Sequence, residues 1–223
     1  AKQRIGKKYK GSSFIAYFQA YTNTYAPVDK LRSLYMPIIK RDDISGLSIA
    51  TRPDCLSEDT ISFLDELNMI KPVWVELGLQ TSKEESIKYI RRGYETKIYD
   101  EAVSCLNEKG IHTITHIIIG LPGEDENDML DSVRHALEAG TKGLKLQLLH
   151  VLKGTDLEKD YKEGKFETLT FEGYLEILKK CLEIIPDEIV IHRLTGDGPK
   201  KLLVSPLWSA DKKMVMNAIR SIT

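Results

Sequence analysis

The sequence predicts an α/β fold with a parallel sheet, and three observations lead to this prediction. Short apolar runs rich in Ile, Val and Leu alternate along the 223 residues with amphipathic stretches of helical period. This β-α-β-α order is sustained, and such alternation produces parallel strands joined by right-handed crossovers. No linker, repeat or low-complexity segment interrupts it, so we expect one large domain. An open doubly wound sheet and a full or partial barrel both satisfy this order.

Six apolar runs are predicted strands, and the clearest of them ends abruptly at a turn. The stretch "HIIIGLPGE" carries an isoleucine run that stops at Gly120 and continues through Pro122, Gly123 and Glu124. Ligands of parallel α/β folds bind at the carboxyl ends of the strands, so we expect this turn on the binding face. The predicted strands are 13–20, 46–50, 73–79, 112–119, 143–151 and 188–194.

Helical periodicity fills the intervals between these strands. Ser57 is the predicted N-cap of one helix, and Thr81 to Glu84 reads as a capping box at the start of another. Cys105 and Cys181 fall on apolar stripes, which predicts buried structural thiols. The predicted helices are 28–40, 58–69, 82–92, 97–109, a stripe over 129–137, 171–185 and a weaker one over 210–221.

Composition excludes several classes of protein. The 32 Lys and Arg balance 33 Asp and Glu for a net charge of −1, which gives no global argument for nucleic acid or an acidic membrane. No apolar stretch approaches the roughly 20 residues of a membrane span, and no signal peptide precedes the first strand. Three widely spaced cysteines favour a reducing cytoplasm. They lack metal-ligand spacing, so we expect no metal site built from this chain alone.

Polar side chains collect where the predicted strands end, which favours one binding cleft. There is no Ser/His/Asp spacing, no carboxylate pair, no phosphate-binding loop and no Gly-x-Gly-x-x-Gly, so hydrolysis by side chains alone finds little support. In chain order, the polar set is Gln19, Tyr21, Thr22, Asn23, Thr24, Thr51, Arg52, Asp54, Glu76, Gln80, Thr81, Arg91, Arg92, His116, Gln147, His150, His192, Arg193, Thr195 and Asp197.

Four blocks of sequence, "GLSIATRPDCL", "ELGLQT…RRGYE", "HIIIGLPGE" and "LQLLHVLKGT", together resemble the radical S-adenosylmethionine (SAM) superfamily. The branch resembled is that of uncharacterised bacterial proteins described as Elp3-like or Fe-S oxidoreductases, related to oxygen-independent coproporphyrinogen oxidases. The resemblance implies a partial (β/α)6 barrel of the TIM type. It also implies a [4Fe–4S] cluster, an electron donor and reductive cleavage of SAM to a 5′-deoxyadenosyl radical.

The resemblance also assigns roles to individual residues. Thr22, Asn23 and Thr24 match the turn beside the methionine amino group of SAM. Gln80 and Arg92 match positions that hold the ribose and carboxylate, and His116 lies near the ribose hydroxyls. Ile118 and Gly120 match the strand end along the adenine. The residues expected on the substrate side are Arg52, Gln147, His150, Arg193 and Asp197, with Arg193 suited to a carboxylate or phosphate.

Two departures from the family pattern shape the expectation. Ala50 stands where many relatives have glutamate, and the Cys-x3-Cys-x2-Cys triplet of the cluster is missing. We therefore expect a piece of a radical SAM protein that lacks the first strand and the cluster loop and is inactive alone. Residues 1–186 would form the core and 187–223 a C-terminal extension. The strand edge left open is a possible dimer contact.

Two other readings stay open on the sequence. A cluster-free (β/α) enzyme would need a catalytic acid or lysine at a strand end, and only Glu76 offers itself. The other of these two readings is a non-catalytic module that docks on RNA or protein. Substrate and product, whether a small molecule or RNA, are not readable from the sequence.

Overall fold

The computed structural model describes residues 13–19, 21–196 and 198–222 and contains a six-stranded sheet in the order β1-β2-β3-β4-β5-β7. The β1/β2, β2/β3 and β5/β7 pairs are parallel. This sheet and its intervening helices confirm the predicted α/β class and the partial barrel of the TIM type. The strands are β1 (Phe14–Phe18), β2 (Ile44–Thr51), β3 (Val73–Gln80), β4 (His112–Ile119), β5 (Gly143–Leu148) and β7 (Val190–Arg193).

All six predicted strands are present, but those predicted over 13–20, 143–151 and 188–194 were too long. β5 ends at Leu148, and the next residues form a separate short strand, β6 (Val151–Leu152), which pairs antiparallel with β8 (Leu203–Ser205). Strands of two or three residues are too short to show a hydrophobic period, so the sequence carried no signal for this pair.

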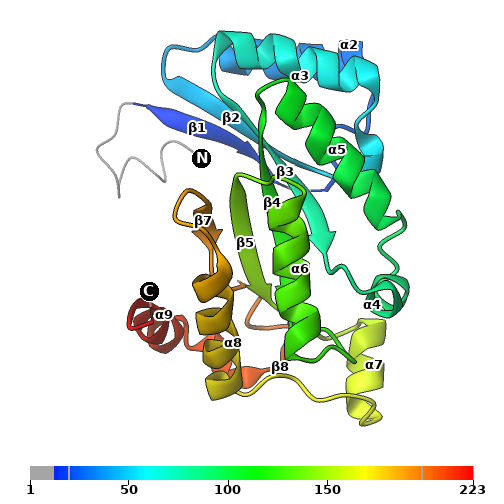
Figure 1. The fold of residues 1–223 in the computed structure, drawn as a ribbon, viewed down its shortest axis with the longest axis vertical. Coiled ribbons are helices and arrows are strands. Elements are labelled where there is room, and N and C mark those ends of the chain that lie inside the picture. The colour runs from blue at the N-terminus through cyan, green and yellow to red at the C-terminus, as the bar shows by residue number, and fades with distance from the viewer. Residues whose placement is uncertain (1–12, 20, 197, 223) are drawn as a thin grey trace. The chain divides into compact units, whose positions relative to one another are not determined.

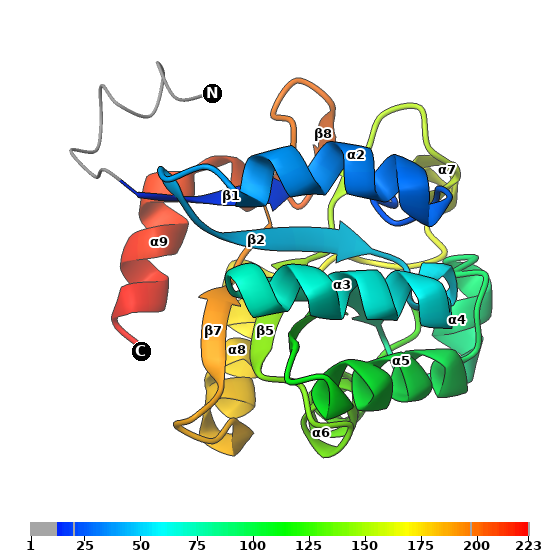
Figure 2. The same ribbon diagram turned by 90° about the horizontal axis from the view of Figure 1, so that it is seen from above.

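The chain divides into two compact units, of which the first comprises the residues up to 78 together with 97–114. Its helices are α2 (Val28–Ile39), α3 (Glu58–Ile70) and most of α5 (Thr96–Glu108), with a short 3-10 turn η1 (Pro53–Cys55). The Ser57 side chain accepts a hydrogen bond from Thr60 N, which confirms the predicted N-cap. α2 packs against α3 and β2 (Figure 2), over fully buried Leu47 and Ile49.

The second unit comprises 79–96 and the residues from 115 onward. Asp125 and Asp128 form a capping box at the start of α6. α6 packs beside α8 (Figure 1), and the core includes fully buried Ile117 and Tyr174. Within the described residues no helix is both long and apolar enough to cross a membrane. The elements are α4 (Glu84–Tyr89), α6 (Glu126–Glu138), α7 (Asp156–Lys162), α8 (Phe171–Ile184), η2 (Leu207–Ala210) and α9 (Lys212–Arg220).

The capping box predicted at Thr81 to Glu84 is wrong. Lys83 is the N-cap of α4 and makes no side-chain cap, because its ammonium group cannot accept a hydrogen bond. The Thr81 hydroxyl accepts from Lys83 N and donates to the Glu124 carboxylate. α4 is also shorter than predicted, since the chain leaves the helix before Arg91, whose φ is +54°.

The prediction that Cys105 is buried is also wrong, whereas Cys181 is buried as expected. The buried stripe of α5 runs through Tyr99, Ala102, Val103 and Leu106. Cys105 lies at the margin of that stripe and is exposed. The apolar pattern was wider than the face that packs, because its margin lines an open pocket.

Candidate functional site

The turn after β3 has an unusual backbone that one arginine holds in place. Gln80, the last residue of β3, is half-buried and adopts a left-handed φ of +66°, which is uncommon for a residue with a side chain. Arg92 Nη1 donates to the carbonyls of both neighbours, Leu79 at 2.8 Å and Thr81 at 3.0 Å. The guanidinium therefore fixes the kink from which the Gln80 side chain projects.

Two other nitrogens of Arg92 also donate to protein acceptors. Nε donates to the Tyr94 carbonyl at 3.1 Å and Nη2 to the Thr96 hydroxyl at 3.0 Å. The guanidinium lies over the Tyr94 ring, 4.7 Å from its centroid, and the residue is 6% exposed. These contacts hold Arg92 beside the turn of Gln80, and its expected role against the cofactor stays a prediction.

The turn after β4 explains the glycine at the end of the isoleucine run. Gly120 has φ +91°, and a Cβ there would lie 2.9 Å from Leu169 Cδ1. Its N–H donates to Met129 Sδ at 3.2 Å, and the Ile119 carbonyl accepts from Leu149 N. Only glycine meets both the backbone angle and the close approach of Leu169.

Side chains tie the β3–α4 turn to the β4–α6 turn. The Thr81 hydroxyl donates to Glu124 Oε1 at 2.6 Å. Lys83 Nζ donates to the Gly123 carbonyl at 2.8 Å and pairs with Asp128 at 2.6 Å. Because β3 and β4 are neighbours in the sheet, these bonds fix the two turns as one rim at the carboxyl ends of the strands.

Within this rim, Glu124 lies in an unfavourable environment for a charged carboxylate. Burial raises the pKa of its carboxyl, although the hydrogen bond from Thr81 opposes the rise. Its Oε2 atom is buried and has no hydrogen-bond partner among the described residues. Burial and the unsatisfied oxygen both disfavour the charged form of this carboxyl group.

Glu124→Gln is expected to reduce the pH dependence of folding. A raised pKa means that the folded chain holds this proton more tightly than the unfolded chain does. Its stabilising contribution is therefore fully present below the ordinary value of 4.5 and is lost as pH rises through the folded pKa. The variant cannot titrate there, so urea unfolding from pH 4 to 8 should show it gaining stability relative to the wild type as pH rises. A difference that stays constant with pH would contradict this.

Half-buried positions on β4 and β5 complete this part of the site. His116 and Ile118 share one face of β4, and between and beside them Thr115, Ile117 and Ile119 are buried. His116 Nδ1 and Gln147 Nε2 lie 3.0 Å apart in a hydrogen bond. Gln80, His116, Ile118 and Gln147 thus belong to the carboxyl-terminal halves of β3, β4 and β5, and Gly120 directly follows β4, as the sequence predicted.

His150 and Arg193 lie in the same unit, farther along the chain. His150 Nε2 is 3.1 Å from Ser209 Oγ, and a Cβ at Gly196 would lie 2.5 Å from the imidazole. Arg193 is the last residue of β7 and is half-buried. Asp197, the other predicted substrate residue, lies outside the described residues.

In the first unit, polar side chains of the turn after β1 form hydrogen bonds with residues near the end of β2. Asn23 Nδ2 donates to the Ala50 carbonyl at 2.8 Å, and the Thr24 hydroxyl donates to the Cys55 carbonyl at 2.7 Å. Thr24 also bonds to the Thr51 hydroxyl, while Thr22 is half-buried. The Asn23 and Thr24 side chains therefore fasten this turn to the end of β2 and to η1.

Glu76 does not sit at a strand end. It is in the middle of β3, 3% exposed, and accepts from Ser48 Oγ at 2.7 Å and Tyr17 Oη at 2.8 Å. These bonds hold the carboxylate among the strands, so the cluster-free enzyme loses the strand-end acid on which that reading depended.

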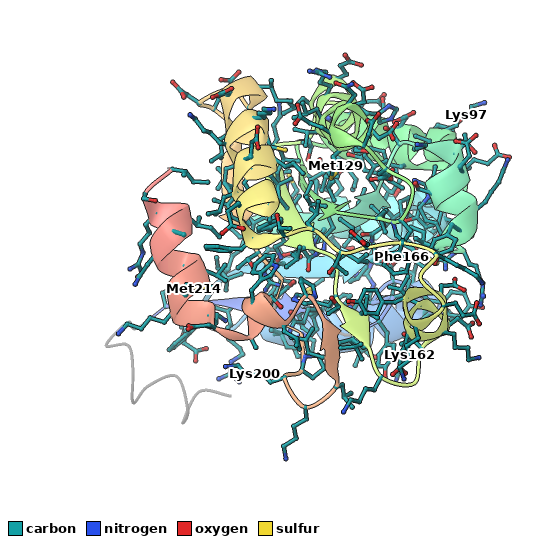
Figure 3. The ribbon with its side chains drawn as sticks, turned by 90° about the horizontal axis from the view of Figure 1, so that it is seen from below. Lys97, Met129, Lys162, Phe166, Lys200 and Met214 are labelled. Atoms are coloured by element: carbon teal, nitrogen blue, oxygen red, sulfur yellow. The ribbon has the colours of Figure 1, made fainter. Side chains whose placement is uncertain are left out.

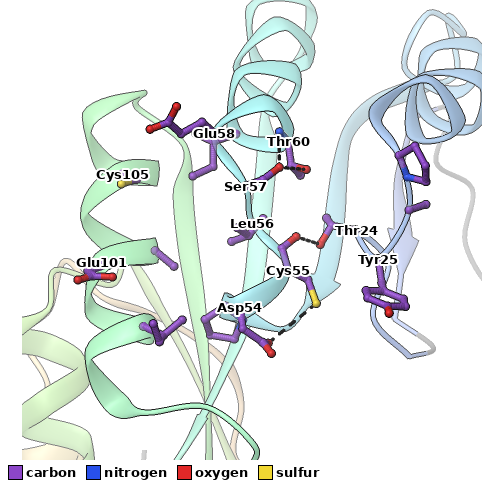
Figure 4. Close-up of a pocket in the computed structure, with 16 residues that line it drawn as sticks. Thr24, Tyr25, Asp54, Cys55, Leu56, Ser57, Glu58, Thr60, Glu101 and Cys105 are labelled. Carbon is purple, nitrogen blue, oxygen red and sulfur yellow. Dashed lines mark hydrogen bonds between the residues drawn. The ribbon is translucent and has the colours of Figure 1, made fainter.

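A separate pocket of about 770 Å³ lies in the first unit, between the turns after β1 and β2 and the helices α3 and α5 (Figure 4). Cys55 and Cys105 both line it, and burial is the main cause that raises the pKa of the Cys55 thiol. Arg52, predicted on the substrate side, pairs with Asp54 at 2.7 Å, and its side chain is 43% exposed. Within the part of the chain that the structure describes, no three His, Cys, Asp or Glu side chains gather as a metal site.

Comparison with known families decides the class of this protein. A sequence model described as the radical SAM superfamily matches residues 2–136, and one for the radical SAM C-terminal domain matches 141–222. The chain belongs to the radical SAM superfamily. The uncharacterised protein YtqA of Bacillus subtilis is 45% identical over 218 residues, which are 98% of this chain and 68% of that protein. The chain therefore spans about two thirds of the length of this relative.

Solved structures of radical SAM proteins share the fold. Elp3 of the archaeon Methanocaldococcus infernus aligns with a TM-score of 0.78 at 19% identity, over 97% of this chain and 56% of that one. Coproporphyrinogen III oxidase from Escherichia coli aligns with a TM-score of 0.60 at 15% identity, over 76% and 39%. These likenesses confirm the resemblance to the Elp3-like branch at the level of the fold.

Proposed function

We propose that this chain is the SAM-binding part of an enzyme that cleaves SAM reductively and directs the resulting 5′-deoxyadenosyl radical at a substrate. Membership of the superfamily supports the general class. The observation that carries the proposal for this chain is the rim of β3 and β4, where Arg92 fixes the turn of Gln80 and the Thr81–Glu124 bond ties it to the turn of Gly120.

The residues of this rim fit the chemistry of SAM. Ile118 offers a half-buried apolar surface for the adenine, and Gly120 follows it two residues later in a turn that a side chain would disturb. The His116–Gln147 pair provides polar atoms for ribose hydroxyls, and the half-buried Gln80 amide provides both a donor and an acceptor. Bound SAM would supply the 5′-deoxyadenosyl group, and these side chains would orient it.

The three cysteines do not fit the cluster. Cys181 is on the buried face of α8 with its pKa raised by burial to about 12, whereas a cluster ligand must be a thiolate. Cys55 also has a raised pKa, and Cys105 is exposed on a helix. We therefore assign the [4Fe–4S] ligands to residues other than these three and derive no step from them.

Partners and location remain part of the proposal. We infer an electron donor, a cytoplasmic location and a small-molecule or RNA substrate, with a dimer through the β1 edge as a further possibility. Ile15 and Tyr17 on β1, at one end of the strand order, are 54% and 41% exposed. The name of the archaeal Elp3 gives that relative's identity only, so it does not decide between the substrates.

Binding of SAM to the purified chain, measured by isothermal titration calorimetry, tests the proposal. His116→Ala should weaken binding by about tenfold, the effect of losing one good hydrogen bond. His112→Ala is the matched control, because His112 begins the same strand and is exposed. The proposal fails if the wild-type chain binds no SAM, or if both substitutions weaken binding equally.

A further inference from the structure

We propose that a pocket between β7 and α9 binds a phosphate group of the substrate. The pocket has a volume of about 370 Å³, within the range of small-molecule sites. This inference rests on the proposed function, since it assigns the substrate side of the same enzyme. The described residues that line it are Ile191, His192, Arg193, Leu194, Thr195, Gly196, Lys212, Met216 and Ile219.

The charged side chains of the pocket all have the same sign. Arg193 and Lys212 line it beside His192, and none of its described lining residues is acidic. Arg193 is half-buried, yet its side chain makes no hydrogen bond or ion pair with any described residue. A partly desolvated guanidinium without a partner is costly, and an anion would satisfy it.

The surrounding segment carries an excess of positive charge, which favours binding of an anion with more than one negative charge. Residues 190–222 contain six Lys and Arg and two Asp, whereas the whole chain carries a net charge of −1. Positive charge is therefore concentrated in this segment. Lys200, labelled in Figure 3, and His150 line an adjoining crevice that shares Thr195, Gly196 and Lys212 with the pocket.

The shape of the pocket distinguishes a phosphate ester from a free inorganic ion. Leu194, Met216 and Ile219 give it an apolar side, which suits the organic part of a ligand. Arg193 offers a planar fork for two oxygens and Lys212 a point charge, which together match a dianion better than one carboxylate. The pocket also opens at the carboxyl end of β7, where ligands of parallel sheets bind.

Titration of the chain with pyrophosphate by calorimetry at low ionic strength tests the site. Arg193→Gln should weaken binding by about tenfold or more, and Arg193→Lys should restore part of it. Lys213→Gln also removes one positive charge, at the residue that follows Lys212 in α9. Lys213 does not line the pocket, so this substitution should change binding little. Thermal unfolding of each variant shows whether it folds.

The outcomes separate this inference from the proposed function. Pyrophosphate binding that is absent, or equal in wild type and Arg193→Gln, overturns the site, as does equal weakening by Lys213→Gln. SAM titrations on the same samples should be unchanged by Arg193→Gln. If SAM does not bind but pyrophosphate binds through Arg193, the proposed function fails and the anion site stands. Competition by a single-stranded RNA oligonucleotide or by a nucleoside monophosphate then identifies the source of the phosphate.

Discussion

Replacing Arg92 by Met is expected to lower the free energy of unfolding by about 3 kcal/mol or more, the cost of breaking a buried charged hydrogen-bond network. The substitution keeps much of the aliphatic volume but removes the donor from the Thr81 and Tyr94 carbonyls and one of two donors from the Leu79 carbonyl. The Leu79 and Thr81 carbonyls flank Gln80, so the loss falls on this turn. The turn should therefore open before the rest of its unit.

Urea unfolding followed by circular dichroism measures this loss, and hydrogen exchange at Thr81 and Ser82 locates it. Arg91→Gln is the control, because Arg91 is the adjacent residue and its side chain is 77% exposed, with only a surface pair to Asp156. That variant should unfold almost as the wild type does. Equal losses in the two variants would show that Arg92 contributes only general charge.

The sequence was sufficient for the six strands of the main sheet and for the helices between them, but not for α7 or the β6/β8 pair. Short apolar runs located every strand of the six-stranded sheet, because a strand buried on both faces must be almost wholly apolar. The Gly120 turn was placed correctly for the same reason. What the patterns could not provide was the state of each polar side chain. Thr24 and Arg92 stand at family positions, yet their atoms bond to the protein itself.

The contacts that were missed join segments distant in sequence. Thr81 and Glu124 are 43 residues apart, and Lys83 and Asp128 are 45 apart, so no local pattern connects them. Glu124 could have been singled out from the sequence, because it ends the motif "GLPGE" in the turn that follows the isoleucine run. Cys105 shows the opposite error, since a helical stripe indicates which residues are apolar but not how wide the packed face is.

Gly120→Ala is expected to destabilise the chain by about 2–5 kcal/mol. One part is the backbone, since φ of +91° is strained for any residue with a Cβ, at about 1–2 kcal/mol. The other is steric, because the new Cβ would lie 2.9 Å from Leu169 Cδ1 and 3.2 Å from its Cγ. Leu169 or the turn must move, and overpacking of this kind costs about 1–3 kcal/mol.

Gly123→Ala separates the two parts of that cost within the same turn. Gly123 has φ +78°, and a Cβ added there would have nothing within 4 Å, so its substitution carries the backbone strain without the collision. Urea unfolding should therefore rank wild type above Gly123→Ala and Gly123→Ala above Gly120→Ala. SAM titration adds a second reading, because only Gly120 lies beside the proposed adenine surface of Ile118. Binding weakened in Gly120→Ala but retained in Gly123→Ala would support that placement, whereas equal stability and equal binding in both variants would show that Leu169 yields freely and that the turn does not contact SAM.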